Sequence, residues 1–438
     1  MTCCTPNPEL TPGANADARA FDRSDTLDMR WITSALLFIF VLAACFSAVR
    51  KDVTKGFDEL AHISYVAEVQ QMPGRVRLDQ LRMLDPVTFQ FNSAPNYLNH
   101  SPAYYRAMAV IGTPVEGHPG SILRLRLVNV VIAAFGLGLL FSLSLSVARS
   151  TEESLILVVP IFCIPILSAL AGSVNNDNLA FAGGAMTLFG SWRFLEGKRT
   201  SGLGFALAGL VACGAAKLTA LILCGGYLMV LAALVRPKLT RLQLGLAAVA
   251  FALALWPYVA LWMTYGSPAP DTPGLEAQLL NGAAAMGWAS RPRLGVLAYT
   301  LHFAGEFIAG WKPLLTQRTA IQTAMLTLPA IVLLMAAAGL LAAARTLMCK
   351  ARDDRFAMIV VAGSTAIAAT LLMHMGFSYR HHLQTGWLMD AYPRYYLPLL
   401  FVVPMATLAL VRSIAPGRGR TSAAGFLIAA PILFGLFG

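Results

Sequence analysis

Charged side chains are scarce in this sequence. Of its 438 residues only 13% are Asp, Glu, Lys or Arg, while 57% are hydrophobic. So few charged residues cannot form the polar surface of ordinary soluble domains. The composition is also unlike that of collagen or of disordered chains. Apolar runs such as 31–49 and 321–344 approach the ~20 residues that a bilayer span needs. The composition therefore predicts an all-α, polytopic membrane protein.

Cysteines are few, and their spacing shows no pairs. Seven occur in the chain, in the N-terminal tail, inside apolar runs or in one basic loop, so neither a disulfide framework nor a zinc site is predicted. The sequence also lacks a glycine-rich phosphate loop, a Gly-x-Ser-x-Gly elbow and a His-Glu-x-x-His motif. These absences argue against nucleotide cofactors and zinc-protease chemistry. The cysteines stand at positions 3, 4, 45, 163, 213, 224 and 349.

Hydropathy predicts about eleven membrane spans, and ten or twelve are also compatible with the pattern. The stretch 202–235 is short for two helices, and Lys217 marks the expected break between them. We find no clear internal repeat and almost no ionisable residue deep within a span, which is unlike an inverted-repeat transporter. The predicted spans are 31–49, 127–147, 154–171, 179–195, 202–215, 218–235, 243–265, 321–344, 356–374, 395–411 and 421–438.

Basic residues gather in alternate connections between these spans. If the N-terminus is cytoplasmic, one side collects 14 basic against five acidic residues, a balance of +9 within the total of +11. Because loops rich in Lys and Arg stay in the cytoplasm, we predict a multi-pass protein of the cytoplasmic (inner) membrane. The charge is then topological and indicates no nucleic-acid partner. The opposite, outer face receives the loops 50–126, 172–178, 266–320 and 375–394. All seven histidines lie in these loops or at the adjoining helix ends.

Composition divides the chain into three regions. Residues 1–30 are predicted to form a disordered cytoplasmic tail. Residues 31–265 form the predicted membrane catalytic module, whose long first outer loop, 50–126, is expected to contain helices at the membrane surface. Residues 266–438 supply a second outer loop and the C-terminal spans, and are expected to set acceptor choice. The run 42–45 imitates a lipoprotein cleavage site, but the acidic excess of the tail favours a retained anchor.

The first outer loop opens with a cluster of polar residues. If this segment is helical, Asp58, His62 and Tyr65 share one face. A carboxylate beside a histidine at the membrane surface can act as a general base or a metal ligand. The alternative is a solvated amphipathic helix with an ion pair between Asp58 and His62.

Two further outer segments carry candidate binding residues. Tyr104 and Tyr105 follow His100 at a predicted helix start, where their rings would either stack on a sugar or form an interfacial aromatic belt. Asp177 precedes the fourth span. It is expected either to cap that helix or to lie near Asp58 and hold the acceptor or a metal ion.

Cations near the membrane surface suggest phosphate recognition. Lys217 lies between two apolar runs and would either snorkel to the headgroups or meet a lipid phosphate. Arg380 and Arg394 are candidates for gripping a polyprenyl phosphate in a bidentate fork, with interfacial anchoring as the alternative. His381 and His382 are weak candidates for metal ligation.

The order of these motifs resembles the GT-C superfamily of integral-membrane glycosyltransferases. The resemblance covers most of 31–411 and is nearest to the bacterial branch related to protein O-mannosyltransferases and lipid A aminoarabinose transferases. It is carried by Phe57-Asp58-Glu59-x-x-His62, then His100-Ser101-Pro102-Ala103-Tyr104-Tyr105, then Asn176-Asp177, Lys217 and Pro393-Arg394-Tyr395-Tyr396-Leu397-Pro398.

The resemblance implies roles for individual residues. It places the catalytic carboxylate on Asp58, with Glu59 beside it, and matches Arg394 and Tyr395 to a late Arg-Tyr pair. The segment 100–105 is similar to the family's His-Pro-Pro-Leu-Tyr-Tyr stretch but departs from it at two positions. Together with the residue arguments, this gives nine predicted substrate-binding residues: His62, His100, Tyr104, Tyr105, Asp177, Lys217, Arg380, Arg394 and Tyr395.

The predicted function follows from these roles. The chain is expected to move a sugar from a polyprenyl-phosphate donor to an extracytoplasmic acceptor, which is a glycan, lipid or protein of the cell envelope. A lipid or glycan flippase, a transporter, and an O-antigen polymerase or ligase are the alternatives. The last class more typically carries its largest outer loop late in the chain. The sequence identifies no cofactor with certainty, and a divalent metal held by Asp58, Asp177, His381 or His382 stays open.

Overall fold

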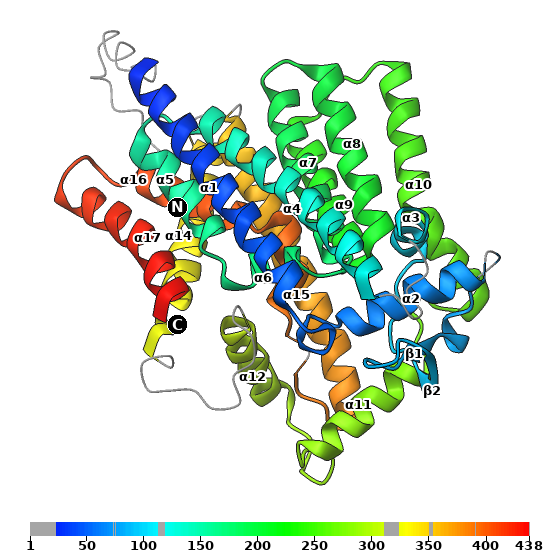
Figure 1. Cartoon of the computed structure of the whole chain (residues 1–438). Helices are drawn as coiled ribbons and strands as arrows, with labels where there is room; N and C mark the ends of the chain where they lie inside the picture. The colour runs from blue at the N-terminus through cyan, green and yellow to red at the C-terminus, as the bar shows by residue number, and fades with distance from the viewer. Residues whose placement is uncertain are drawn as a thin grey trace, which may run out of the picture.

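Helices make up most of the computed structural model (Figure 1). The structure describes residues 23–437 except 73, 75, 113–118, 311–323, 350–353 and 390. The predicted disordered tail falls largely outside these residues. Its end, however, is helical, because α1 (Arg23–Arg50) begins inside it. The first apolar helix therefore starts before the boundary expected at residue 31.

Every predicted span coincides with a helix or a bent helix pair. Within the described residues, eight single helices are long and apolar enough to cross a membrane, and two bent pairs bring the number to ten. The remaining predicted span is α7 (Asp177–Leu195), whose side chains are mostly buried among other helices. The other single helices are α4 (Pro119–Val147), α8 (Arg199–Ala216), α9 (Leu218–Val235), α10 (Arg241–Tyr265), α14 (Thr327–Cys349), α15 (Arg355–Thr385) and α17 (Arg418–Phe437).

The two bent pairs are broken at prolines. α5 (Thr151–Phe162) and α6 (Pro165–Ala171) meet at 58°, while η4 (Pro393–Leu399) and α16 (Val402–Ser413) meet at 65°. Proline supplies no backbone N–H and clashes with the preceding turn, so a helix bends or restarts there. The second break separates η4, which begins with the Pro-Arg-Tyr-Tyr sequence, from α16.

Close packing fixes α7 in the centre of the bundle. A Cβ on Gly190 would stand 2.3 Å from the backbone nitrogen of Ala206, and one on Gly184 would stand 2.0 Å from the carbonyl oxygen of Pro398. Only glycine permits these approaches, which let α8 and η4 lie directly against α7. This packing fixes the position of α7, whose first residue is Asp177.

The described part of the long first loop, 50–126, contains two α-helices, as expected. These are α2 (Glu59–Gln71) and α3 (Ala103–Ile111). The all-α prediction misses a two-stranded antiparallel ribbon, β1 (Arg82–Leu84) and β2 (Phe91–Pro95), in which Leu84 pairs with Phe91. β1 has only three residues, and the five residues of β2, FNSAP, do not alternate between apolar and polar, so neither strand shows a period in the sequence. The remaining elements here are η2 (Val53–Lys55) and η3 (Leu78–Gln80).

The second outer loop lies at the same end of the bundle as the first. It holds α11 (Pro273–Ala285) and α12 (Val296–Ala309), which Figure 1 places with α2 and the β ribbon at one end of the long helices. A Cβ on Gly274 would stand 2.4 Å from the carbonyl oxygen of Asn96, so the two loops are in contact. The outer loops together therefore form one cap on the bundle.

Candidate active site

Four charged residues from separate parts of the chain meet beneath this cap. Arg394 Nη2 donates to Asp58 Oδ2, and Arg394 Nε lies 3.6 Å from Asp177 Oδ2. Lys217 Nζ donates to Asp177 Oδ1. We call Asp58, Asp177, Lys217 and Arg394 the charge cluster. Their contact agrees with the predicted topology, because all four come from the ends of helices that were assigned to one face.

Asp58 occupies an unusual backbone conformation just before α2. It is the residue preceding the helix, with φ 58° and ψ 21°, so it does not share a helical face with His62 and Tyr65 as predicted. Left-handed geometry costs a non-glycine residue about 1 kcal/mol. Tyr97 donates to Asp58 Oδ1 at 3.0 Å, and the Asp58 side chain is 31% exposed. It is the most accessible member of the charge cluster.

The carboxyl of Asp58 is held ionised by its neighbours. Burial alone would raise its pKa, but the charge of Arg394 and the hydrogen bond from it bring the pKa below its ordinary value. The charge of Asp58 and that of Arg394 thus stabilise each other at the edge of the protein interior.

Asp177 and Lys217 form the deeper half of the charge cluster. Asp177 is the first residue of α7 and makes no capping bond, and its own N–H donates to Asn175 Oδ1 at 2.8 Å. The capping alternative is therefore wrong, and the carboxylate faces Lys217. Lys217 is the extended residue between α8 and α9, as predicted, but it is only 2% exposed. It therefore does not snorkel to the headgroups.

Aromatic rings surround the two cations. The Lys217 ammonium lies 4.0 Å from the ring centroid of Tyr395, and the Arg394 guanidinium lies 5.1 Å from that of Tyr392 and 5.9 Å from that of Phe57. The faces of such rings attract cations. Arg394 is buried, which excludes the interfacial-anchor alternative. Its Nε atom has no hydrogen-bond partner among the described residues.

The two predicted histidines lie beside the charge cluster as neutral rings. His62 and His100 stack with their centroids 6.1 Å apart, and His62 Nδ1 is 2.9 Å from the hydroxyl of Tyr105. Burial lowers the pKa of His62 to about 3 and that of His100 to about 4, where the charge of Lys217 adds to the effect. The solvated-helix alternative is wrong, because most of α2 is buried.

Tyr104 and Tyr105 pack inside the cap and not on its surface. They are 1% and 0% exposed. Tyr104 donates to Asn129 Oδ1 at 2.9 Å, while the ring of Tyr105 stacks on that of Tyr65 at 3.8 Å. Neither residue is placed to stack on a sugar or to form an interfacial belt. Their role in the structure is to support α2 and the ring of His62.

Glu59 has a different environment from its neighbour Asp58. It is completely buried, and Arg126 binds both of its oxygens, with Nε 2.8 Å from Oε1 and Nη2 2.7 Å from Oε2. The backbone N–H of Val174 also donates to Oε1 at 2.8 Å. A carboxylate engaged in this way cannot accept a proton from a substrate. The prediction of a second catalytic carboxylate here is therefore corrected.

Arg380, His381 and His382 lie on α15 and have other partners. Arg380 Nη2 donates to Asp271 Oδ2 at the surface, and His381 Nε2 is 3.5 Å from Asp271 Oδ1. His382 accepts a hydrogen bond from the backbone N–H of Leu294 at 2.8 Å. The predicted joint phosphate grip of Arg380 and Arg394 is not present in this arrangement.

The candidate metal ligands do not converge. Asp58 and Asp177 both contact Arg394, whereas His381 contacts Asp271. Within the part of the chain that the structure describes, no group of three or more His, Cys, Asp or Glu side chains is arranged to hold a metal ion.

Three residues of the site escape the sequence reasoning. They are Arg126, Tyr97 and Asn175, whose side-chain nitrogen donates to the carbonyl oxygen of Phe57 at 2.7 Å. An arginine directly before the span predicted at 127–147 was the available signal for the first. Tyr97 and Asn175 lie close in sequence to the predicted site residues His100 and Asp177, but nothing in their spacing distinguishes them from other loop residues.

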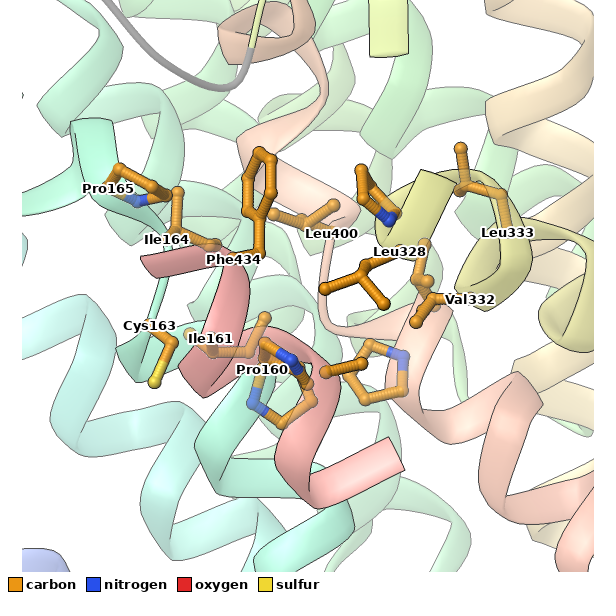
Figure 2. Close-up of a pocket in the computed structure, with 15 residues that line it drawn as sticks. Pro160, Ile161, Cys163, Ile164, Pro165, Leu328, Val332, Leu333, Leu400 and Phe434 are labelled. Atoms are coloured by element: carbon orange, nitrogen blue, oxygen red, sulfur yellow. The ribbon is translucent and has the colours of Figure 1, made fainter. Parts of the chain in front are cut away.

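A separate cavity of about 110 Å³ lies among the proline-broken helices (Figure 2). Its walls come from the α5–α6 break, α14, the η4–α16 break and α17, and include Pro160, Leu328, Leu400 and Phe434. The lining side chains are all apolar apart from the thiol of Cys163. None of the predicted site residues reaches it, so the cavity offers no group for acid, base or phosphate chemistry.

Known proteins similar to this chain are found among solved structures. No protein-family model matches the chain, and no curated protein matches it. Two crystal structures of ArnT from Cupriavidus metallidurans are similar in the course of the chain. The one bound to undecaprenyl phosphate has 14% identity and a TM-score of 0.38, over 92% of this chain and 85% of that one. The apo structure has 15% identity and a TM-score of 0.37, over 87% and 77%. At these values the likeness defines neither substrate nor mechanism.

Proposed function

We propose that this protein is a membrane glycosyltransferase. It moves a sugar from a polyprenyl-phosphate donor to an acceptor hydroxyl on the outer side of the cytoplasmic membrane. The observation that carries the proposal is the charge cluster, in which the partly exposed Asp58 carboxylate pairs with the buried Arg394, and Asp177 links Arg394 to the buried Lys217. Such an arrangement combines a proton acceptor with groups that stabilise a departing phosphate.

The cations account for recognition of the donor phosphate. Arg394 presents a planar fork that stays charged when buried, and its Nε has no hydrogen-bond partner among the described residues. Lys217 adds a second, compact charge nearby. In the resting arrangement Asp58 and Asp177 neutralise these cations, so donor binding exchanges part of the carboxylate contacts for phosphate contacts.

The reaction is a single displacement. Asp58 accepts the proton of the acceptor hydroxyl as the acceptor oxygen bonds to the anomeric carbon, and the bond from that carbon to the phosphate oxygen breaks. The charge that develops on the leaving lipid phosphate is stabilised by Arg394 and Lys217. The attack and the departure occur on opposite faces of the sugar, which inverts the anomeric centre.

Basic residues at the far ends of the helices that carry the charge cluster support the proposal that the site faces the outer side of the membrane. Lys217 separates α8 and α9, whose far ends carry Arg199 and Arg236, and α7 has Arg193 in its last turn. Positive residues favour the cytoplasmic side. Since nucleotide sugars are cytoplasmic, a transferase working on the other side needs a sugar already carried across, and a polyprenyl phosphate provides it.

Location of the charges also favours transfer over transport. All four members of the charge cluster come from helix ends or loops, whereas coupling sites of transporters usually lie near mid-membrane. A transporter that merely bound the lipid phosphate would tolerate the loss of Asp58.

The test compares the natural protein with Asp58→Asn in lipid bilayers. Asparagine adopts the left-handed conformation readily, so the backbone before α2 is preserved. We expect Asp58→Asn to release free polyprenyl phosphate from a pool of polyprenyl-phosphate sugars about 10²–10⁴-fold more slowly, while still binding the lipid. Normal release by the variant would refute Asp58 as the base. Lipid binding without release by the natural protein, with envelope extract present as acceptor, would favour transport.

A further inference from the structure

The Glu59–Arg126 ion pair connects the chain segments that surround the charge cluster. Besides gripping both Glu59 oxygens, Arg126 donates through Nη1 to the carbonyl oxygen of Ala48 at 2.8 Å and to that of Lys51 at 2.9 Å. One side chain of α4 thus binds the end of α1, the residue that follows α1 and the first residue of α2. The side chains of Glu59 and Arg126 are 0% and 6% exposed.

The same pair reaches the loop that carries Asp177. Glu59 Oε1 accepts from the backbone N–H of Val174, and the next residue, Asn175, donates to the carbonyl oxygen of Phe57 at 2.7 Å. Asn175 Oδ1 accepts from the N–H of Asp177 at 2.8 Å. The backbone on both sides of Asp58 is therefore tied to the segment that begins α7.

We propose that Glu59 and Arg126 are a positioning pair for the transfer reaction. This inference rests on the proposed function. The pair holds Asp58 in its left-handed conformation and sets the separation of the Asp58 and Asp177 carboxylates, between which Arg394 lies. A strained residue persists only where its surroundings fix it, and a buried bidentate ion pair with further backbone bonds is a rigid support. Catalysis depends steeply on such placement.

The chain offers a matched control at its other end. Glu153 is likewise a buried carboxylate held by an arginine, with Arg412 Nε 3.1 Å from Oε1 and Nη2 2.7 Å from Oε2. It joins α5 to α16 far from the charge cluster. Removing the charge of Glu153 therefore reproduces the general effect of leaving a buried arginine unpaired, without touching the segments around Asp58.

The experiment measures donor turnover and thermal unfolding for Glu59→Gln and Glu153→Gln in the full-length protein in lipid. For Glu59→Gln we expect kcat to fall about a hundredfold. Its KM for the polyprenyl-phosphate sugar should change less than about threefold, because Lys217 and Arg394 are kept. Glu153→Gln should lower the unfolding temperature and leave kcat near that of the natural protein.

Two outcomes would overturn the inference. One is a folded Glu59→Gln variant whose kcat equals that of the natural protein. The other is an equal loss of kcat in Glu59→Gln and Glu153→Gln, which would mean a general loss of structure. If Glu59→Gln does not fold, Arg126→Lys keeps the charge but not the fork and is measured in the same way, with the same two outcomes.

Hydrogen exchange separates this inference from the proposed function. We expect Glu59→Gln to speed amide exchange in 52–60 and in 172–178, and Glu153→Gln to leave both segments unchanged. If the natural protein releases no lipid phosphate, the proposed function fails, and the exchange result still decides whether the pair joins the two segments. Unchanged exchange in Glu59→Gln would refute the positioning role directly.

Discussion

Two groups of buried charges lie at opposite ends of the helix bundle, and they differ in how completely their polar atoms are satisfied. At one end, Glu153 receives two bonds from Arg412 and one from the backbone N–H of Arg149 at 2.7 Å. Arg412 also donates to the carbonyl oxygen of Val147 at 2.9 Å. At the other end, in the charge cluster, Arg394 Nε has no hydrogen-bond partner among the described residues and lies 3.6 Å from Asp177 Oδ2.

The two groups also differ in the backbone conformation and in the exposure of their acidic residues, Glu153 and Asp58. Glu153 is a regular helical residue whose side chain is 3% exposed, whereas Asp58 has a left-handed conformation and a side chain that is 31% exposed. A buried ion pair is by itself a structural feature that contributes little net stability. Incomplete pairing, backbone strain and access together are what distinguish a candidate active site.

Apart from Asp58→Asn, the variant expected to have the largest effect is Arg394→Lys. The substitution keeps the positive charge beside Asp58 but removes the planar fork. We expect kcat/KM for the polyprenyl-phosphate sugar to fall about 10²–10³-fold, as when a preorganised donor to a developing charge is lost. Steady-state release of polyprenyl phosphate in lipid measures it. If kcat/KM of the variant equals that of the natural protein, the charge cluster is a structural ion pair like Glu153–Arg412.

A smaller effect should appear on acidification. The pKa values of His62 and His100 are lowered to about 3 and about 4, so both rings stay neutral in the folded protein at pH 5. In the unfolded chain they take up protons below about pH 6.5. Stability is therefore expected to fall between pH 6.5 and 5, by about 1.4 kcal/mol per pH unit for each histidine.

Thermal unfolding at pH 7 and pH 5 measures this loss. The control is the double variant His62→Gln and His100→Gln, in which the difference between the two pH values should shrink. An unfolding temperature that is the same at both pH values in the natural protein would show that the two rings are not buried as neutral groups.

The smallest effect is expected for Arg380→Ala. Arg380 is half exposed and pairs with Asp271 at the surface, where an ion pair is worth about 0–1 kcal/mol. Donor KM should therefore change less than about threefold. The measurement is donor release over a range of donor concentrations. A large rise in KM would restore the sequence-based prediction that Arg380 grips the phosphate together with Arg394.

Sequence patterns predicted the helices better than the surroundings of individual side chains. Every predicted span coincides with a helix or a bent pair, since long apolar runs allow few other structures in a membrane. The order in which the predicted spans cross the membrane also placed Asp58, Asp177, Lys217 and Arg394 on the same side of it. The structure brings these four residues into contact.

Burial and pairing were less predictable because they depend on contacts between distant segments. Tyr104 and Tyr105 carry the aromatic pattern of a sugar platform or an interfacial belt, yet they pack inside the cap. Glu59 follows Asp58 directly, but Arg126, 67 residues further along the chain, occupies both of its oxygens. Because α2 begins at Glu59, Asp58 lies outside the helix and does not share a helical face with His62.

The most direct test of the account follows a donor labelled separately in its sugar and in its polyprenyl phosphate, with the natural protein in sealed vesicles and envelope extract as acceptor. The account predicts that the two labels separate, with the sugar on the acceptor and free polyprenyl phosphate left in the bilayer, and that Asp58→Asn prevents the separation. If both labels stay together while the intact donor moves between leaflets, the protein is a transporter and the central claim is wrong.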